Sequence, residues 1–301
     1  MQAPIQAGVI GLGAMGAPMA RNLAGQDLLV SVWNRTGSRA VSIAAELNVA
    51  AAESPRQLAA GCNIVLICVS ADDDLLQVTG QLMPGLAKGS IVVDTSTVNP
   101  ATAKKVAGLL AKKGVGFIDA PVSGGVEGAI NARLSVMAGG DSADLLRIRP
   151  VLEAISATIT HMGPVGSGQA TKAVNQVIIG GVAEAVCEAL ALSEKLNLPS
   201  ERLLSVLGAG AAGSWFLEHR GHSMLQDRFE QGFKLELLLK DLKIIRALAR
   251  ELDISMTTVE SAISDYEQLV AAGDGDNDIS GLIRLKRNPA DKDGTETGTV
   301  G

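Results

Sequence analysis

The chain has 301 residues, of which 47% are hydrophobic and 19% are charged, enough to bury a core in one large domain or two ordinary ones. This composition excludes a disordered or fibrous protein. Lys and Arg total 26 against 32 Asp and Glu, a formal net charge of −6. No basic surplus is available for a phosphate backbone, so we expect no nucleic-acid partner.

Three features bear on cellular location and metal binding. The uncharged stretch at residues 173–182 falls short of the roughly 20 apolar residues of a membrane span, and the N-terminus lacks a signal-peptide pattern. The three cysteines are odd in number and form no C-x-x-C pair, so we expect inert core thiols. His219 and His222 have no third ligand at metal-site spacing. We therefore expect a cytoplasmic protein with no membrane segment and no metal.

Short apolar runs alternate with amphipathic segments in the first half of the chain. The runs predict strands over residues 5–10, 28–33, 63–69, 91–94, 116–119, 135–138 and 158–161. The amphipathic segments predict helices over residues 14–24, 38–47, 55–60, 73–79, 100–113 and 143–152. Because parallel strands need such crossovers, this α/β pattern predicts a Rossmann-type, doubly wound parallel sheet.

Strand signals end at the glycine-rich segment 163–168, and helical periodicity follows. Helices are expected over residues 169–196, 200–207, 215–226, 235–252 and 257–272, with a last short one capped by Asp278 or Ser280. We predict three parts: an NADP-binding Rossmann domain over 1–165, an all-helical domain for substrate and oligomerisation over 166–287, and a flexible tail over 288–301.

The helix predicted at 169–196 is apolar on all sides, which is typical of a buried helix. Its Gly180-Gly181 pair lowers helix propensity by about 1 kcal/mol per glycine, so we expect another helix to approach closely there. One small helical domain does not cover this much apolar surface. We therefore expect a homodimer or homotetramer.

The segment Gly11-Leu12-Gly13-Ala14-Met15-Gly16 matches G-x-G-x-x-G between a predicted strand and a predicted helix. In this motif the first glycine permits a tight turn, the second admits a pyrophosphate, and the third allows helix and strand to pack closely. The free N–H groups at the helix start face the phosphates. This context predicts dinucleotide binding.

The end of the second strand selects the nucleotide. NAD sites carry an acid there for the ribose 2′-OH, but this chain has Asn34-Arg35-Thr36. A guanidinium beside a neutral amide and a hydroxyl suits a 2′-phosphate, which predicts NADP over NAD. An ordinary exposed arginine at a strand end is the alternative interpretation.

Polar groups follow two other neighbouring strands, where ligands of such sheets bind. Val69 and Ser70 are also expected among the cofactor-binding residues. The segment 94–97 ends one strand with hydroxyl groups, and the segment 119–125 ends the next with a hydroxyl and N–H groups able to bind a carboxylate. Ordinary turn chemistry is the alternative for each segment alone.

Lys172 is a candidate proton donor and acceptor because it lies at the start of the apolar helix. An ammonium there needs water or partners, so a lysine at this position indicates a cleft. Asn175 is three residues further on the same helical face and can hold Lys172 or a substrate oxygen. A snorkelling surface lysine is the alternative interpretation.

These motifs, in this order, resemble the β-hydroxyacid dehydrogenase family, which includes 3-hydroxyisobutyrate dehydrogenases, tartronate semialdehyde reductases and glyoxylate/succinic semialdehyde reductases. The resemblance covers nearly the whole chain and adds the segment from Phe233 to Leu242. It implies that Lys172 is the catalytic acid/base, with Asn175 positioning it. It also implies that Ser123, Gly124 and Gly125 hold the substrate carboxylate and that Thr97 contacts the cofactor or the substrate. Phe233 and Lys240 would contact the cofactor, with Asp241 as a supporting group.

The expected function is therefore NADP-dependent interconversion of a short β-hydroxyacid and its semialdehyde or keto acid by hydride transfer. The expected partner is a small carboxylate-bearing aldehyde or hydroxyacid. Imine reductases share this scaffold but usually replace the lysine, and Lys172 favours a carbonyl or alcohol substrate. A catalytically silent NADP-binding and assembly module is the rival from another class.

Overall fold

The structure is a computed structural model that describes residues 4–229 and 232–288. The chain divides into two compact units, Met1–Asn175 and Gln176–Gly301, which are taken in turn below. The division falls inside one long helix, ten residues beyond the boundary expected from the glycine-rich segment. The tail expected over 288–301 lies, except for its first residue, outside the described residues.

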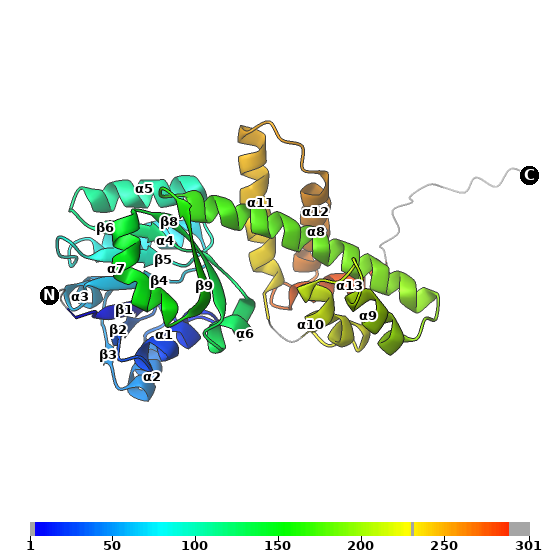
Figure 1. The fold of residues 1–301 in the computed structure, drawn as a ribbon, viewed down its shortest axis with the longest axis horizontal. Helices are drawn as coiled ribbons and strands as arrows, with labels where there is room; N and C mark the ends of the chain where they lie inside the picture. The colour runs from blue at the N-terminus through cyan, green and yellow to red at the C-terminus, as the bar shows by residue number, and fades with distance from the viewer. Residues whose placement is uncertain (1–3, 230–231, 289–301) are drawn as a thin grey trace, which may run out of the picture. The chain divides into compact units, whose positions relative to one another are not determined.

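A nine-stranded sheet forms the centre of the first unit (Figure 1). Its strands are β1 (Ala7–Ile10), β2 (Leu29–Trp33), β3 (Ala50–Ala51), β4 (Ile64–Ile67), β5 (Ile91–Asp94), β6 (Gly116–Asp119), β7 (Val122–Ser123), β8 (Leu134–Gly140) and β9 (Ser156–Gly163). Their order is β3-β2-β1-β4-β5-β6-β8-β7, with β9 also paired to β8. The chain winds outward from β1 in both directions, so the topological switch point lies between β1 and β4.

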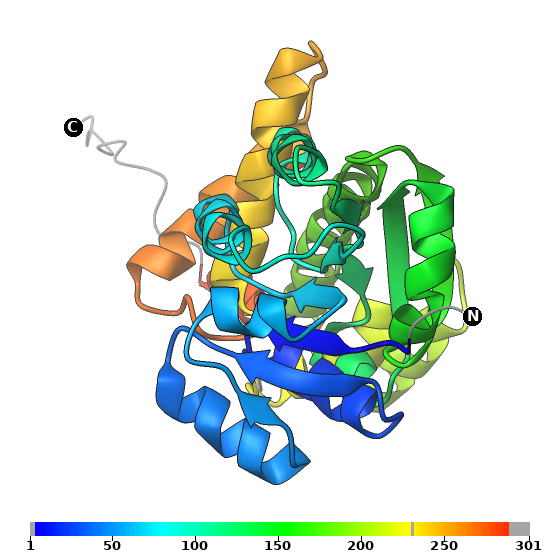
Figure 2. The same cartoon turned by 90° about the vertical axis from the view of Figure 1, so that its left-hand side faces the viewer.

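Helices cover both faces of this sheet (Figure 2). They are α1 (Gly16–Ala24), α2 (Gly37–Leu47), α3 (Pro55–Ala60), α4 (Asp72–Leu82), α5 (Pro100–Ala111), α6 (Gly125–Ile130) and α7 (Ser142–Glu153). Alternate strand residues face opposite layers: Leu66 belongs to the core shared with α1, α2, α6 and α7, whereas Val65 and Ile67 belong to the core shared with α3, α4 and α5. Two apolar layers thus hold the sheet between helices, as in doubly wound folds.

Helix α8 (Ser167–Lys195) crosses from the first unit to the second. The second unit continues with α9 (Ser200–Gly208), α10 (Trp215–Leu225), α11 (Leu235–Glu251), α12 (Thr257–Ala271), the 3-10 helix η1 (Ile279–Leu282) and α13 (Ile283–Arg287). A Cβ at Gly180 would lie 3.1 Å from the side chain of Leu242, and one at Gly181 would lie 3.4 Å from Thr258. The close approach expected at the glycine pair is present, and α11 and α12 make it.

By length and composition α8 is apolar enough to cross a membrane, which the expectation from residues 173–182 did not anticipate. Half of its most apolar stretch is buried within the protein, and the core helix of a water-soluble protein passes the same test. Gln169, Gln176 and Glu184 are at most 5% exposed on this helix. These buried polar groups are typical of the core helix of a folded domain.

The expected Rossmann-type sheet and helical C-terminal region are confirmed, with two corrections. The sheet is mixed, because β8 runs antiparallel to both β6 and β7. Strands β3 and β7 and helix α6 were not expected. The last two arise within the segment 119–130, whose proline and three glycines are typical of a turn.

Candidate active site

The glycine-rich loop after β1 is shaped by its neighbours, as the motif requires. Gly11 has φ +88°, and a Cβ there would lie 2.0 Å from the Cys68 carbonyl oxygen. A Cβ at Gly16 would lie 1.8 Å from the Gly11 carbonyl oxygen, whereas one at Gly13 meets nothing within 4 Å. Gly11 and Gly16 therefore permit the turn and the packing of α1. Gly13 keeps space open beside the loop.

The helix start after this loop fits a bound phosphate. Met15 precedes α1 and provides no side-chain cap, and no acidic residue lies in the first turn. The Ala17 N–H donates to the Gly13 carbonyl oxygen at 3.2 Å and Pro18 has no N–H, so an outside anion would meet the N–H groups of the loop and the positive end of the helix dipole. The residues Gly11, Leu12, Gly13, Ala14, Met15 and Gly16 therefore fit the pyrophosphate of a dinucleotide, whose nicotinamide ring would supply the hydride chemistry.

The segment after β2 connects to the glycine loop through Asn34. Its Oδ1 accepts a hydrogen bond from the Leu12 N–H at 2.9 Å, and its Nδ2 donates to the Thr36 carbonyl oxygen at 3.2 Å. The Arg35 side chain is 80% exposed and donates from Nη1 to Asp74 Oδ1 at 3.0 Å. The exposed guanidinium remains accessible to a phosphate. The role of Asp74 as its partner was not expected.

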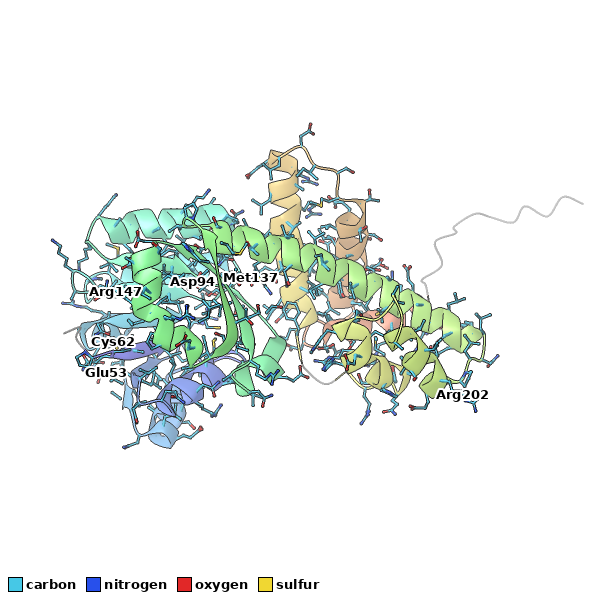
Figure 3. All side chains as sticks on the ribbon, viewed as in Figure 1. Glu53, Cys62, Asp94, Met137, Arg147 and Arg202 are labelled. Carbon is cyan, nitrogen blue, oxygen red and sulfur yellow. The ribbon has the colours of Figure 1, made fainter. Side chains whose placement is uncertain are left out.

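The ends of β4 and β5 are joined by side-chain hydrogen bonds. Ser96 Oγ accepts from the Val69 N–H at 2.8 Å, and the Ser96 N–H donates to Asp94 Oδ1 at 3.1 Å. Asp94 is labelled at the end of β5 in Figure 3. Val69, Ser70 and Thr97 thus belong to adjoining loops at the carboxyl ends of neighbouring parallel strands, where doubly wound sheets bind ligands. Ser96 organises these loops and was not singled out from the sequence.

Ser123, Gly124 and Gly125 lie where β7 ends and α6 begins. Ser123 pairs with Ser135 of β8, and the two glycines have φ +124° and +63°. Positive φ at both positions favours glycine, since L side chains rarely adopt it. The segment is therefore a strand end followed by a helix start rather than a plain loop.

Asp119 at the end of β6 binds the backbone at the start of α8. Its Oδ1 accepts from the Gly166 N–H at 2.8 Å, and its Oδ2 accepts from the Gln169 N–H at 2.9 Å. Burial raises the pKa of this carboxyl to about 6, and the hydrogen bonds from backbone N–H groups partly offset that rise. Below neutral pH the site therefore contains a carboxyl that takes up a proton.

Lys172 follows one turn later and is only 7% exposed, so it is not the snorkelling surface lysine of the alternative interpretation. Gln169, Lys172 and Gln176 are spaced three and four residues apart and form a buried polar stripe on α8. Asn175, beside this stripe, is half-buried. A buried lysine among polar neighbours is the kind of group that proton transfer uses.

Two predicted cofactor residues, Phe233 and Lys240, belong to the second unit. Asp278, buried there, accepts from the Phe233 N–H at 2.9 Å. The Lys240 amine is 2.9 Å from Asp241 Oδ1, and Gln176 Nε2 donates to Asp241 Oδ2 at 2.8 Å. Asp241 thus contacts Lys240, and its supporting role at the cofactor stays a prediction. Lys240 is 25% exposed at its side chain, so it is not an ordinary surface lysine.

The remaining polar candidates have other partners. Among residues 4–229 and 232–288, no group of three or more His, Cys, Asp or Glu side chains is placed to hold a metal ion. The His219 ring stacks on Trp215 with centroids 4.2 Å apart, and His222 Nδ1 lies 3.4 Å from Glu201. The three cysteines are free thiols, and burial raises the pKa of Cys62 to about 12.

The fold and these residues define a nicotinamide-dependent dehydrogenase, and comparison with known proteins gives the family. Residues 6–163 match the family described as the NAD binding domain of 6-phosphogluconate dehydrogenase. Residues 166–286 match the NAD-binding domain of NADP-dependent 3-hydroxyisobutyrate dehydrogenase. The chain belongs to the β-hydroxyacid dehydrogenase family of NAD(P)-dependent oxidoreductases.

Three relatives illustrate the match. The chain is 34% identical to 2-hydroxy-3-oxopropionate reductase of Escherichia coli, over 92% of this chain and 95% of the relative. It is 31% identical to NAD-dependent L-serine dehydrogenase of Pseudomonas aeruginosa, over 93% and 97%. The solved structure of Mycobacterium tuberculosis 3-hydroxyisobutyrate dehydrogenase with L-serine superposes with a TM-score of 0.85 at 30% identity, covering 95% of this chain and 100% of that one.

Two of the loop glycines, Gly11 and Gly13, predict different effects of alanine. Gly13→Ala should fold with wild-type stability but lose at least about tenfold in NADPH affinity, because its Cβ enters open space beside the phosphate-binding turn. Gly11→Ala should lose about 2 kcal/mol or more in unfolding free energy from backbone strain and overlap with Cys68. Urea unfolding and NADPH fluorescence titration measure both, with exposed Gly108→Ala as the control. Wild-type NADPH affinity in Gly13→Ala contradicts the assignment.

Asp119 predicts a pH-dependent stability. Its pKa is about 6 in the folded protein and about 4 when unfolded, so the folded state binds the proton more tightly between these values. The carboxyl's contribution should therefore lower the unfolding free energy as pH rises from about 4 to about 6, by up to roughly 3 kcal/mol. Urea unfolding of wild type and Asp119→Asn from pH 4.5 to 7.5 measures this. A stability difference independent of pH contradicts it.

Proposed function

We propose that the chain is a cytoplasmic, NADP-dependent oxidoreductase that interconverts a short β-hydroxyacid and its semialdehyde or keto acid, with Lys172 as general acid/base. The observation that carries this proposal is the burial of Lys172 one turn after the backbone segment bound by Asp119. An amine removed from water needs polar partners, and an active site provides them. Membership of the family supplies the reaction class.

The protein groups divide the work of the reaction. A nicotinamide held by the glycine-rich loop would supply the hydride chemistry in both directions. The Lys172 ammonium donates a proton to the carbonyl oxygen during reduction, and its neutral amine accepts the hydroxyl proton during oxidation. Asn175, on the adjoining part of the helix, holds Lys172 or the substrate oxygen. General acid/base action of this kind contributes about 10² to 10⁴ in rate.

Binding residues orient the two reactants. Ser123, Gly124 and Gly125 hold the substrate carboxylate through the hydroxyl and N–H groups at the start of α6. Thr97 contacts the cofactor or the substrate after β5. Val69, Ser70, Phe233 and Lys240 complete the set of cofactor contacts.

NADP is proposed over NAD because Arg35 presents a guanidinium at the end of β2 and no acid replaces Asn34 there. The relatives carry both preferences in their names: one family description is NADP-dependent, whereas the Pseudomonas aeruginosa relative is NAD-dependent. Asp74 accepts from Arg35, so a 2′-phosphate would share or replace that bond.

A homo-oligomer is proposed from the apolar surface of the second unit. Ile178 and Leu192 of α8 are 59% and 60% exposed, Leu196 directly after this helix is 59% exposed, and Val206 of α9 is 66% exposed. Large exposed apolar side chains of this kind are typical of an interface with another copy. A particle of 30.9 kDa in light scattering, the mass of a single chain, contradicts this assembly.

Lys172→Ala tests the reaction assignment. We expect kcat to fall at least about 10²-fold because the proton donor is lost, while the dissociation constant for NADPH stays within about twofold. Oxidation of NADPH at 340 nm is followed with glyoxylate, succinic semialdehyde, tartronate semialdehyde and methylmalonate semialdehyde. Exposed Lys105→Ala is the control. Tight NADPH binding with no turnover of any of these by wild type would favour the silent binding module.

Arg35→Ala tests the cofactor assignment. We expect KM for NADPH to rise at least about tenfold, since a charge-assisted contact is lost, with KM for NADH nearly unchanged. Asp74→Asn removes the competing carboxylate and should lower KM for NADPH or leave it unchanged. Arg39→Ala is the control four residues away. An unchanged NADPH preference in Arg35→Ala, or an equal loss in Arg39→Ala, contradicts the role of Arg35.

A further inference from the structure

The first turn of α8 is held to the first unit by two buried side chains that the proposed reaction does not use. Asp119 is fully buried and accepts backbone hydrogen bonds on both carboxylate oxygens, on Oδ1 from Gly166 and on Oδ2 from Gln169. These partners lie 47 and 50 residues along the chain from Asp119. The bonds therefore join the end of β6 directly to the start of α8.

The side chain of Gln169 makes a second connection from the same turn. It is 1% exposed, its Oε1 accepts from the Val98 N–H at 3.1 Å, and its Nε2 donates to the Ser96 carbonyl oxygen at 2.8 Å. Both bonds reach the loop after β5. Ser96 in turn accepts from Val69 at the end of β4, so hydrogen bonds continue from α8 to the loops of two neighbouring strands.

Close backbone packing leaves this turn little room to shift. A Cβ at Gly168 would lie 2.4 Å from the Met137 carbonyl oxygen and 2.5 Å from that of Asp119. A Cβ at Gly139 would lie 2.7 Å from the Gly168 N. Both glycines permit an approach that any side chain would block, so the helix start rests directly on β6 and β8.

We propose that Asp119 and Gln169 are positioning residues, which fix the first turn of α8 and thereby the place of the Lys172 amine. Lys172 is three residues after Gln169 and shares its face of the helix. A shift of the turn therefore moves Lys172 with it. This inference rests on the proposed function of Lys172, because positioning matters to rate only if the amine transfers the proton.

The effect on rate follows from the geometry that proton transfer needs. A misplacement of about 1 Å in a reacting group can lower a rate about 10²-fold without weakening the binding of either reactant. Neither Asp119 nor Gln169 touches the reacting atoms in this account. Loss of either should therefore lower kcat and leave cofactor binding intact.

Asp119→Asn is the test variant, because an asparagine keeps one acceptor oxygen and turns an NH2 group toward the second N–H. Asp141→Asn is the matched control in the same unit. Asp141 precedes α7, and only its Oδ1 accepts, from Ala143 at 2.8 Å and Asp144 at 3.2 Å. The side-chain oxygen of an asparagine can accept the same two hydrogen bonds. The control therefore also removes one negative charge at the start of a helix, but it keeps the hydrogen bonds that cap that helix.

Two measurements are made on the full chain. Hydrogen exchange followed by mass spectrometry should show peptides covering residues 164–172 exchanging at least about tenfold faster in Asp119→Asn and unchanged in Asp141→Asn. Steady-state kinetics should show kcat lowered about 10- to 100-fold in Asp119→Asn, with the NADPH dissociation constant within about twofold of wild type. Asp141→Asn should keep wild-type kcat.

Gln169→Met tests the second connection, the hydrogen bonds from the Gln169 side chain to the loop after β5. It replaces Asp119→Asn if that variant does not fold. Methionine has similar length and packs in buried sites but accepts and donates no strong hydrogen bond. Faster exchange over residues 164–172 together with lowered kcat supports the proposal. Wild-type kcat despite faster exchange, or an equal loss of kcat in Asp141→Asn, overturns it.

The outcome for Lys172→Ala separates the two levels of inference. If wild type and Lys172→Ala turn over substrate equally, the proposed function fails, and the exchange data still report how Asp119 holds α8. If Lys172→Ala is inactive while Asp119→Asn and Gln169→Met keep wild-type kcat, the proposed function stands and the positioning role fails.

Discussion

The contact between the Asp119 carboxylate and the backbone of α8 sets the arrangement on which the candidate active site depends. A carboxylate taken out of water is costly, and burial raises its pKa to about 6. Hydrogen bonds from Gly166 and Gln169 offset part of that cost. A neutral side chain would be easier to bury, but no neutral side chain offers two acceptor oxygens to two N–H groups. The charged carboxylate therefore attaches the start of α8 to β6, although its burial lowers the free energy of unfolding.

That attachment also explains why the glycines lie where they do. The strand ends and the helix start approach so closely that Gly139 and Gly168 leave no room for a Cβ. The same is true of Gly11 and Gly16 at the phosphate-binding loop, whereas Gly13 faces open space. Four of these glycines are required by packing within the protein. The fifth has no such constraint, which is what a residue reserved for close contact with a ligand should show.

Much of the fold could be predicted from the sequence because apolar runs and helical periodicity depend on neighbouring residues. The central strands such as β4 and β5 and the long helices were found within a few residues of their bounds. The sequence did not predict that β8 runs antiparallel to β6, because this direction depends on pairing between residues about twenty positions apart. Strand β7 and helix α6 were missed because proline and glycine near Gly124 are equally typical of a turn.

The candidate site likewise contains residues that a local pattern indicates and residues that no local pattern indicates. The glycine loop is a local motif and Lys172 stands out against an apolar helix, so the sequence alone predicts a role for both. Gln169 and Asp74 were missed because their roles depend on partners far along the chain: Gln169 bonds to Ser96, 73 residues away, and Asp74 to Arg35, 39 residues away. A polar residue whose partner is distant carries no local signal. Conversely, the sequence places Asp119 at the end of a strand but carries no sign of its hydrogen bonds to Gly166 and Gln169, 47 and 50 residues further along the chain.

Helix α8 is bonded to both units through buried carboxylates, and this gives its polar stripe a physical explanation. Within the first unit, Asp119 binds its first turn; within the second, Asp241 accepts from Gln176 of the same helix and also contacts the Lys240 amine. Asp119 binds Gln169 of α8, which is three residues before Lys172. Asp241 binds Gln176 of α8 and directly follows Lys240 on α11. Buried charges of this kind specify position more than they add stability, because hydrophobic pairs of similar volume would be easier to bury. The two acids lie on β6 and α11, and each accepts a hydrogen bond from α8, so the buried glutamines of that helix have partners on the elements packed against it.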